Sequence, residues 1–311
     1  MSEFTALKHD IYCIDALYVK PGVASIYLLQ AADEVAIIET GTYYSVANVL
    51  ATLNELGIAK SRVRYVIPTH VHLDHAGGAS EMMKQFDQAS LIIHPLGARH
   101  MIDPQKLIAG TIGVYGEEKF NRLYGTIEPI PEARVIVAPD LARFEIGNRE
   151  LVFVDTPGHA RHHFCIYDQV SNGVFTGDTF GISYEPMKQL QRGLIPTTPP
   201  VQFDPQALRA SISRIMSFKP ARLYLTHYGE FENPAAQVAS FNQWIDEYVE
   251  LCGRHDSSAT DYEVSLERDL HNLVLQEMRT DDNARLGAVL QTDFRLNAQG
   301  LAHWQRSMRD G

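Results

Sequence analysis

The sequence predicts an α/β protein with a strand-rich core followed by helices alone. Up to residue 227, short apolar runs rich in β-branched residues alternate with segments whose apolar residues recur every three or four positions. After residue 227 the helical pattern continues and the strand pattern does not return. We therefore expect an α/β core domain over residues 1–251 and a C-terminal helical extension over residues 252–311.

The first third of the chain predicts four strands, two helices and an inserted helical segment. The expected strands cover 24–30, 34–39, 63–68 and 90–94, and the expected helices cover 45–56 and 79–86. The insertion covers about 97–124, where a helical pattern separates two strand regions. Such an insertion lies over another surface or packs against a partner, so a homodimer is one arrangement that the sequence allows.

The chain from residue 134 onward predicts two hairpins and then helices. Strands are expected at 134–138 and 143–154, with a turn at Gly147, and at 164–167 and 173–175, around the Asn172-Gly173 turn. Asp204 is a plausible N-cap for a helix that runs to about residue 218, and a strand follows at 222–225. Helices are expected at 234–251 and, after a polar break, from about 263 to the C-terminus.

Composition excludes several classes of function. The net charge of −11 disfavours nucleic-acid binding, which requires a basic surface, and no apolar run reaches the eighteen residues that a membrane span requires. The N-terminal residues do not have the pattern of a secretory signal. Cys13, Cys165 and Cys252 are odd in number and widely spaced, which predicts no disulfide framework. We expect a cytoplasmic protein with a small-molecule substrate.

The candidate chemistry lies where strands end. Four metal-capable side chains follow the strand 63–68 within six residues, and single ones follow later elements; together they are His70, His72, Asp74, His75, His159, Asp178 and His227. If these strands share a sheet and a direction, their ends meet at one edge and the side chains converge there. Imidazole nitrogens and carboxylate oxygens are suitable ligands for zinc, iron or manganese. A single histidine after a strand is usually only a polar loop residue, but the full set is not a chance arrangement.

The segments THVHLDHAGG, TPGH, FTGD and LTH, in this order, resemble the signature of the metallo-β-lactamase superfamily, and most closely its glyoxalase II-like and lactonase-like members. The resemblance implies an αββα sandwich. It also implies that His70, His72 and His159 hold one divalent metal, and that the second is held by Asp74, His75 and His227, with Asp178 bridging both. Zinc is the expected metal, with iron and manganese as the alternatives.

Two further features can be compared with this family. Glu39 stands where the family usually has Asp, so the contacts of its longer side chain are left open. His163 matches a frequent supporting histidine, although a buried strand residue without a role at the site is an equal alternative.

Two metal ions that share a hydroxide would supply a nucleophile at neutral pH, so we expect a hydrolase. Asp74 would bind metal and accept a proton, and the hydroxyl of Tyr184 or Tyr228 could donate to an oxyanion. Apolar residues of the insertion and the C-terminal helices would form an apolar lid, or else belong to the core or to a dimer interface. A lid would favour an acyl lactone or thioester. The alternatives are a phosphodiesterase of the same fold and a non-catalytic ligand-binding regulator that retains the metal site.

Overall fold

The computed structural model describes residues 3–190, 192–199 and 201–310. Two compact units are distinguished. The sheet unit comprises the chain up to Asp155, His162–Gly177 and Pro220–Glu232, and the helical unit comprises Thr156–Arg161, Asp178–Lys219 and the chain from Asn233 onward. All thirteen strands that are named among the described residues lie in the sheet unit.

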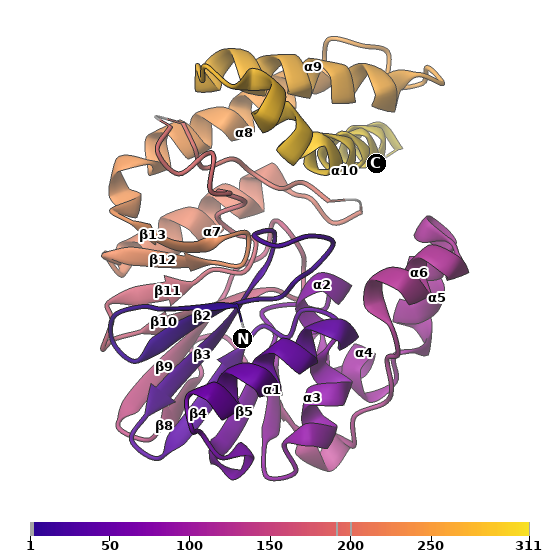
Figure 1. The fold of residues 1–311 in the computed structure, drawn as a ribbon. Coiled ribbons are helices and arrows are strands. Elements are labelled where there is room, and N and C mark those ends of the chain that lie inside the picture. The colour runs from indigo at the N-terminus through magenta and orange to yellow at the C-terminus, as the bar shows by residue number, and fades with distance from the viewer. Residues whose placement is uncertain (1–2, 191, 200, 311) are drawn as a thin grey trace. The chain divides into compact units, whose positions relative to one another are not determined.

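The first sheet of the sheet unit has seven strands in sequence order (Figure 1). The first four strands pair antiparallel and the last four pair parallel, with β4 common to both sets. Their bounds are β1 (Phe4–Ala6), β2 (Ile11–Asp15), β3 (Ser25–Ala31), β4 (Glu34–Ile38), β5 (Val63–Ile67), β6 (Ser90–Ile93) and β7 (Val135–Val137).

The second sheet has six strands in the order β13-β12-β11-β10-β9-β8. Only β11 and β12 pair parallel; the other neighbours are antiparallel. Their bounds are β8 (Arg143–Ile146), β9 (Arg149–Asp155), β10 (Phe164–Asp168), β11 (Gly173–Phe175), β12 (Arg222–Leu225) and β13 (Gly229–Glu232).

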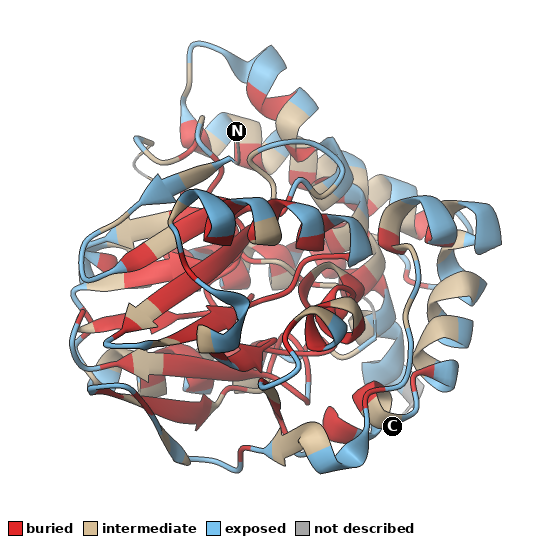
Figure 2. Cartoon of the chain, turned by 60° about the horizontal axis from the view of Figure 1, so that its bottom comes forward, coloured by how far each residue is buried: buried red, intermediate tan, exposed pale blue. Residues whose placement is uncertain are grey.

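The two sheets pack face to face over an apolar core. Alternate residues of both sheets point inward, as the two-residue period of a strand requires. The rings of Phe153 and Phe164 meet edge to face at 4.9 Å, and those of Tyr27 and Phe175 do so at 5.3 Å. The Tyr27 hydroxyl donates to the carbonyl of Leu225 at 2.6 Å, which joins the first sheet to the second. Figure 2 shows these strands as the most continuously buried part of the unit.

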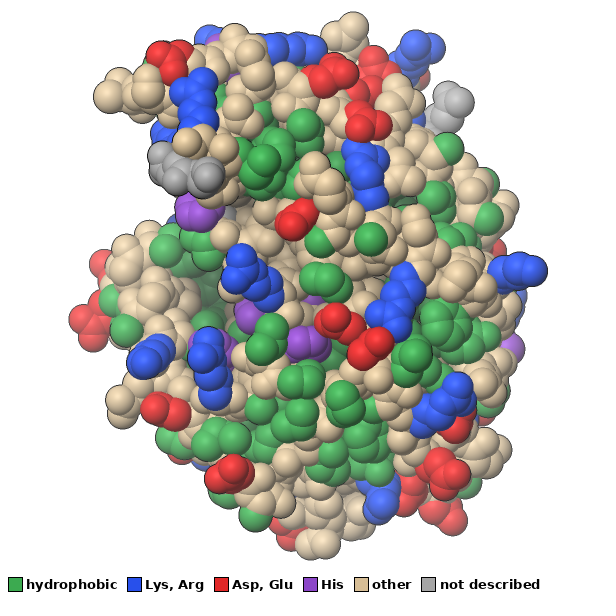
Figure 3. All heavy atoms as spheres, turned by 180° about the vertical axis from the view of Figure 1, so that it is seen from behind, with side chains coloured by type: hydrophobic (Ala, Val, Ile, Leu, Met, Phe, Trp, Pro, Cys, Tyr) green, Lys and Arg blue, Asp and Glu red, His purple; other side chains and the backbone are tan. Residues whose placement is uncertain are grey.

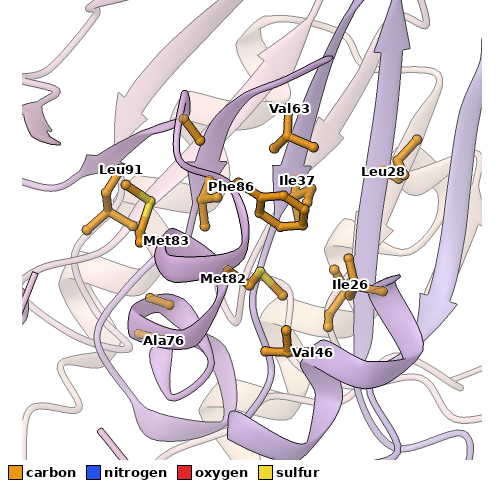
Figure 4. Close-up of a cluster of buried hydrophobic side chains, with 14 of the residues drawn as sticks. Ile26, Leu28, Ile37, Val46, Val63, Ala76, Met82, Met83, Phe86 and Leu91 are labelled. Carbon is orange, nitrogen blue, oxygen red and sulfur yellow. The ribbon is translucent and has the colours of Figure 1, made fainter. Parts of the chain in front are cut away.

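Helices cover the other face of the first sheet. Helix α1 (Val46–Glu55) and helix α3 (Ala79–Gln85) turn Val46, Met82 and Met83 toward Ile37 and Leu91 of the sheet (Figure 4). Each helix buries its apolar face against the sheet and exposes the opposite face. The short 3₁₀ helices of this unit are η1 (Tyr43–Ser45), η2 (Lys60–Arg62) and η3 (Glu132–Arg134).

The predicted insertion is helical and lies between β6 and β7. It forms α4 (Ala98–Ile102), α5 (Gln105–Tyr115) and α6 (Glu117–Tyr124), and α5 and α6 project from the unit (Figure 1). No residue of α5 is buried, although the helix is apolar. Phe120 and Tyr124 of α6 pack on Leu73 instead, so part of the insertion is fixed to the segment that follows β5.

The helical unit contains η4 (Pro234–Ala236), α7 (Pro205–Ser217), α8 (Val238–Cys252), α9 (Tyr262–Met278) and α10 (Asn283–Asp310). The Asp204 carboxylate accepts a hydrogen bond from the Ala207 N–H at 2.9 Å, which confirms the expected N-cap of α7. The prediction of one helix from about residue 263 to the end was wrong. The chain leaves α9 at Arg279, whose φ of 48° is not helical, and a new helix begins at Asn283.

The α/β class, the two packed sheets and the C-terminal helices agree with the expected sandwich. Strands β1, β2 and β13 were not anticipated. The division after residue 251 stays a prediction. Among the helices of the described residues, none combines the length and apolarity needed to cross a lipid bilayer.

Candidate metal centre

Glu39 and the predicted ligands of the sheet unit lie just beyond the carboxyl ends of its strands. Glu39 follows β4, His70 comes three residues after β5, and His227 comes two residues after β12. Because β4 and β5 run parallel, their carboxyl ends open at the same edge of the first sheet. This is where the sequence predicted that the side chains would converge.

The segment 69–76, here called the metal loop, has a local structure that presents adjacent ligands. His72 has extended backbone and precedes the one-turn helix α2 (Leu73–Ala76). Its carbonyl accepts hydrogen bonds from the N–H groups of His75 at 3.0 Å and Ala76 at 2.8 Å. Asp74 and His75 occupy the second and third positions of this turn, so two predicted ligands come from consecutive residues.

Asp74, His75 and His227 form one compact cluster within the sheet unit. One ligand atom from each lies within 4.8 Å of the other two. The Asp74 Oδ2 atom is 3.7 Å from His75 Nε2 and 3.6 Å from His227 Nε2. Zinc–ligand bonds of about 2.0–2.2 Å at a tetrahedral angle separate two ligand atoms by about 3.4 Å, so the cluster fits one divalent ion.

The outer nitrogen of each of these two imidazoles is held by an acceptor. His75 Nδ1 donates to Glu39 Oε1 at 3.0 Å, and His227 Nδ1 donates to the carbonyl of Val23 at 2.7 Å. Each hydrogen bond directs the Nε2 lone pair toward Asp74. This arrangement is the usual support of metal-binding histidines, because it sets both the tautomer and the orientation of the ring.

The carboxylate of Glu39 joins three strand ends. It is 1% exposed, and its Oε1 atom accepts from the hydroxyls of Thr69 at 2.6 Å and Thr226 at 2.9 Å as well as from His75. Its Oε2 atom accepts from the Thr69 N–H at 3.1 Å. The longer glutamate side chain, whose effect was left open, thus links the ends of β4, β5 and β12 directly to a predicted ligand.

The remaining histidines of the metal loop face each other. His70 Nε2 lies 2.9 Å from His72 Nδ1, while His70 Nδ1 lies 3.1 Å from the Thr69 hydroxyl. Because that hydroxyl donates its proton to Glu39, it accepts from His70 Nδ1 and leaves Nε2 as the ligand atom. The buried His163 ring lies 4.9 Å from the His70 ring, and both alternatives for His163, a supporting role and a buried residue without a role at the site, stay predictions.

An apolar group with two phenols borders the metal loop. Leu73, between His72 and Asp74 in the chain, packs on Phe120 and Tyr124 of the insertion, and the hydroxyls of Tyr18 and Tyr124 are 3.2 Å apart. Burial raises the pKa of Tyr124 far above its ordinary value, and the neighbouring Tyr18 and Asp74 raise it further. The Tyr124 phenol is therefore neutral at any physiological pH and within electrostatic range of the Asp74 carboxylate.

Two predicted ligands, His159 and Asp178, lie near each other within the helical unit. His159 and Asp178 are both buried, and His159 Nε2 lies 3.3 Å from Asp178 Oδ2. His159 Nδ1 points to the carbonyl of Thr197 at 3.5 Å, which again leaves Nε2 for a ligand role. The φ of Gly158 is +127°, and a Cβ there would overlap the backbone of Leu208, so this turn requires glycine.

The two predicted catalytic tyrosines have different surroundings. The Tyr184 side chain is 4% exposed, and its hydroxyl donates to Asp293 Oδ1 at 3.2 Å within the helical unit. Tyr228 is half-buried directly after His227 in the sheet unit. The proposed role of each hydroxyl stays a prediction.

Sequence reasoning missed two supporting groups. The Val23 carbonyl is a backbone atom, and no side-chain pattern identifies it. His162 accepts from the Val71 N–H at 3.4 Å, and its ring lies 5.7 Å from the His72 ring. The signal for His162 was its position beside His163 and three residues after His159.

The sequence of this chain is similar to those of several known proteins. A metallo-beta-lactamase fold-containing protein of Sulfurisphaera tokodaii is 27% identical over 213 residues, which are 67% of this chain and 74% of that protein. An acyl-coenzyme A thioesterase of Homo sapiens is 24% identical over 194 residues, which are 56% of this chain and 64% of that protein. A hydroxyacylglutathione hydrolase of Pelagibacter ubique is 26% identical over 117 residues, which are 38% of this chain and 36% of that protein. This chain thus matches less than two thirds of the length of the latter two relatives.

Solved structures share the fold. An archaeal metallo-beta-lactamase superfamily protein from Sulfolobus tokodaii superimposes with a TM-score of 0.66 at 22% identity, covering 95% of this chain and 99% of that one. A metallo-beta-lactamase family protein from Thermus thermophilus gives a TM-score of 0.61 at 20% identity, covering 98% and 95%. The family model of the metallo-beta-lactamase superfamily matches residues 19–227, which include every predicted ligand. The chain belongs to the metallo-beta-lactamase superfamily.

Proposed function

We propose that this protein is a metal-dependent hydrolase that cleaves acyl thioesters. The observation that supports it most is the cluster of Asp74, His75 and His227, whose ligand atoms lie within 4.8 Å of one another. The outer nitrogens of both imidazoles are held by hydrogen bonds. The names of several relatives, including a coenzyme A thioesterase and a hydroxyacylglutathione hydrolase, supply the thioester class.

The proposed ligand set is the one that the sequence resemblance implies, with two divalent metal ions and zinc as the expected metal. It consists of His70, His72, Asp74, His75, His159, Asp178 and His227. A bound divalent ion would lower the pKa of water toward neutrality and polarise the substrate carbonyl. In the reaction, the acyl carbon forms a bond to a water oxygen, its bond to sulfur breaks, and the leaving thiolate receives a proton.

The residues around the cluster have distinct proposed parts in this reaction. Asp74 would hold metal, and its carboxylate would take up the proton released from the attacking water. Glu39 and the Val23 carbonyl hold the Nδ1 atoms of His75 and His227, so that their Nε2 atoms face Asp74 and would be available to a bound ion. Tyr184 and Tyr228 remain candidates for donating to the oxyanion.

The apolar neighbourhood of the metal loop supports an acyl substrate. Leu73 contacts Phe120 and Tyr124, and half-buried residues of α5 extend this apolar group away from the loop. Transfer of an acyl chain from water to such a surface is favourable by about 25 cal/mol of free energy per Å² of apolar area buried. An acyl lactone would gain in the same way and is the second candidate, whereas a simple phosphodiester would not.

The test combines metal analysis with a substrate panel. The panel contains an acyl-coenzyme A, an acyl lactone, a chromogenic phosphodiester and a chromogenic β-lactam. We expect thioester hydrolysis that is lost on chelation and restored by zinc, iron or manganese. The variant His227→Ala should lose metal and turnover together, whereas His303→Ala, at an exposed site on α10, should lose neither.

Two results would contradict the proposal. Hydrolysis of the phosphodiester or the β-lactam in preference to the thioester would reject the substrate class. Failure on the whole panel with metal fully bound would instead favour a non-catalytic ligand-binding protein.

A further inference from the structure

A small group of basic side chains lies at the start of the insertion. It consists of Arg99 and His100 on α4 and Lys106 on α5, here called the basic cluster. Arg99 Nε donates to His100 Nε2 at 3.4 Å, and both Arg99 and Lys106 are exposed. Partial burial lowers the pKa of His100, and the charges of Arg99 and Lys106 lower it further. The charges of Arg99 and Lys106 therefore both act on the same side chain, that of His100.

The positive charge of this cluster is not neutralised within the described residues. The sequence has 27 lysines and arginines against 38 acidic residues, so carboxylates are plentiful. Among residues 3–190, 192–199 and 201–310, however, none forms an ion pair with Arg99 or Lys106. The carboxylate between them in sequence, Asp103, accepts from the Gln105 N–H at 3.3 Å. A local excess of positive charge on an acidic protein attracts an anionic ligand.

A row of imidazoles connects the basic cluster to the metal loop. The His100 ring lies 6.3 Å from the His162 ring, which lies 5.7 Å from the ring of His72. His162 is fixed to the loop by the hydrogen bond from Val71 N–H. All of these residues belong to the sheet unit, and the His162 ring lies between the His100 ring of the cluster and the ring of the predicted ligand His72. Figure 3 shows one face of the molecule, on which lysine, arginine and histidine side chains lie among acidic and hydrophobic ones.

We propose that Arg99, His100 and Lys106 bind the phosphate groups of a coenzyme A thioester, while its thioester carbon lies at the metal loop. This inference rests on the proposed thioesterase function and narrows its substrate class. In such a substrate the pantetheine arm separates the reacting carbonyl from the phosphates. In the protein, ring-to-ring steps of 6.3 Å and 5.7 Å through His162 separate the basic cluster from the metal loop. Arginine and lysine are preferred partners of phosphate oxygens. A neutral lactone offers no group that would use this cluster.

Binding without turnover is the first test. The ligand is a thioether analogue of an acyl-coenzyme A, in which the carbonyl is absent and hydrolysis is impossible. Its dissociation constant is measured by calorimetry against the N-acetylcysteamine analogue that carries the same acyl chain and no phosphate. We expect the double variant Arg99→Gln/Lys106→Gln to weaken binding of the coenzyme A analogue at least tenfold. Binding of the phosphate-free analogue should be unchanged.

Kinetics provide the second readout. With the double variant, KM for the acyl-coenzyme A should rise at least tenfold while kcat stays within twofold. The matching N-acetylcysteamine thioester should keep both constants. Added NaCl should raise KM for the coenzyme A substrate in the wild type and have little effect in the variant, because salt screens exposed charges.

Lys60→Gln is the matched control. Lys60 is exposed in η2, immediately before β5, at the opposite end of that strand from His70, and its side chain donates to Gln85. It should change neither dissociation constant nor KM. Circular dichroism and metal content should be equal in all three proteins.

The failures of the two proposals are distinguishable. Equal effects of the double variant on ligands with and without phosphate, or no effect on either, would overturn the phosphate assignment even if thioesters are hydrolysed. Tighter binding of an S-acylglutathione thioether than of the coenzyme A analogue would also overturn it. Absence of thioester hydrolysis by the metal-loaded wild type would reject the proposed function, whatever the binding data.

Discussion

Replacing Glu39 with Gln tests how the metal loop is supported. The carboxylate accepts four hydrogen bonds, three at Oε1 and one at Oε2. A buried donor that loses its acceptor destabilises the fold. Glutamine has the same shape but offers one oxygen and one NH₂ group. If the NH₂ group takes the Oε2 position, it faces the Thr69 N–H; if it takes the Oε1 position, it faces His75 and two hydroxyls.

The first orientation is expected, because only the Thr69 N–H then loses its acceptor. The free energy of that one lost hydrogen bond sets the expected loss of stability. Losing one buried hydrogen bond to a charged acceptor costs about 1.5–3 kcal/mol. The same change makes His75 a weaker ligand, and removal of such a supporting carboxylate typically lowers metal affinity about 10–100-fold. We expect Glu39→Gln to lose affinity within that range and to lower the unfolding temperature of the metal-free protein.

Metal affinity is measured by competition with a chromophoric chelator, and unfolding by differential scanning calorimetry. Glu145→Gln is the control, because Glu145 is exposed on β8 and should leave both measurements unchanged. Metal affinity of the Glu39→Gln variant within twofold of the wild type would refute the reasoning that this carboxylate orients His75.

Three further predictions concern stability and reactivity. Gly177→Ala should destabilise the protein by about 1–3 kcal/mol in chemical denaturation, because φ is +48° and a Cβ would overlap the His163 ring; wild-type stability would contradict this. Asp168→Asn should cost about 3–5 kcal/mol in the same assay, since it leaves the buried Arg149 cation without its carboxylate at 3.2 Å; a loss below about 1 kcal/mol would contradict it. Burial raises the pKa of Cys252 to about 12, so its thiol stays protonated and should resist iodoacetamide at pH 8 in the native protein, as mass spectrometry of peptides can measure; rapid native labelling would contradict it.

The fold was predictable where a local pattern decides the structure. Except for β8, in which charged and apolar residues alternate, the strands from β3 to β12 follow apolar runs bounded by turn residues, and the Asp204-Pro205 pair marks the start of α7. Strand β13 was missed because Gly229–Glu232 is short and polar and becomes a strand through its pairing with β12. The break between α9 and α10 was missed because the residues there include none of the usual helix terminators, proline or glycine.

The ligands of the candidate site were predictable because they are side chains in a dense, specific motif. The groups that hold these ligands in place were harder to predict from the sequence. The Thr226 hydroxyl and the Val23 carbonyl reach their partners only after β12 and the β2–β3 connection are brought to the same edge. Glu39 was noted as a departure from the family, but the three strand ends that its carboxylate joins are a property of the fold.

The most direct test of the account is the position of the metal itself. Crystals grown with zinc and measured at the zinc absorption edge would give an anomalous difference map. We predict a peak within about 2.0–2.2 Å of Asp74 Oδ2, His75 Nε2 and His227 Nε2, the usual zinc bond lengths. A fully zinc-loaded protein without a peak among these three atoms would contradict the metal centre and the function proposed for it.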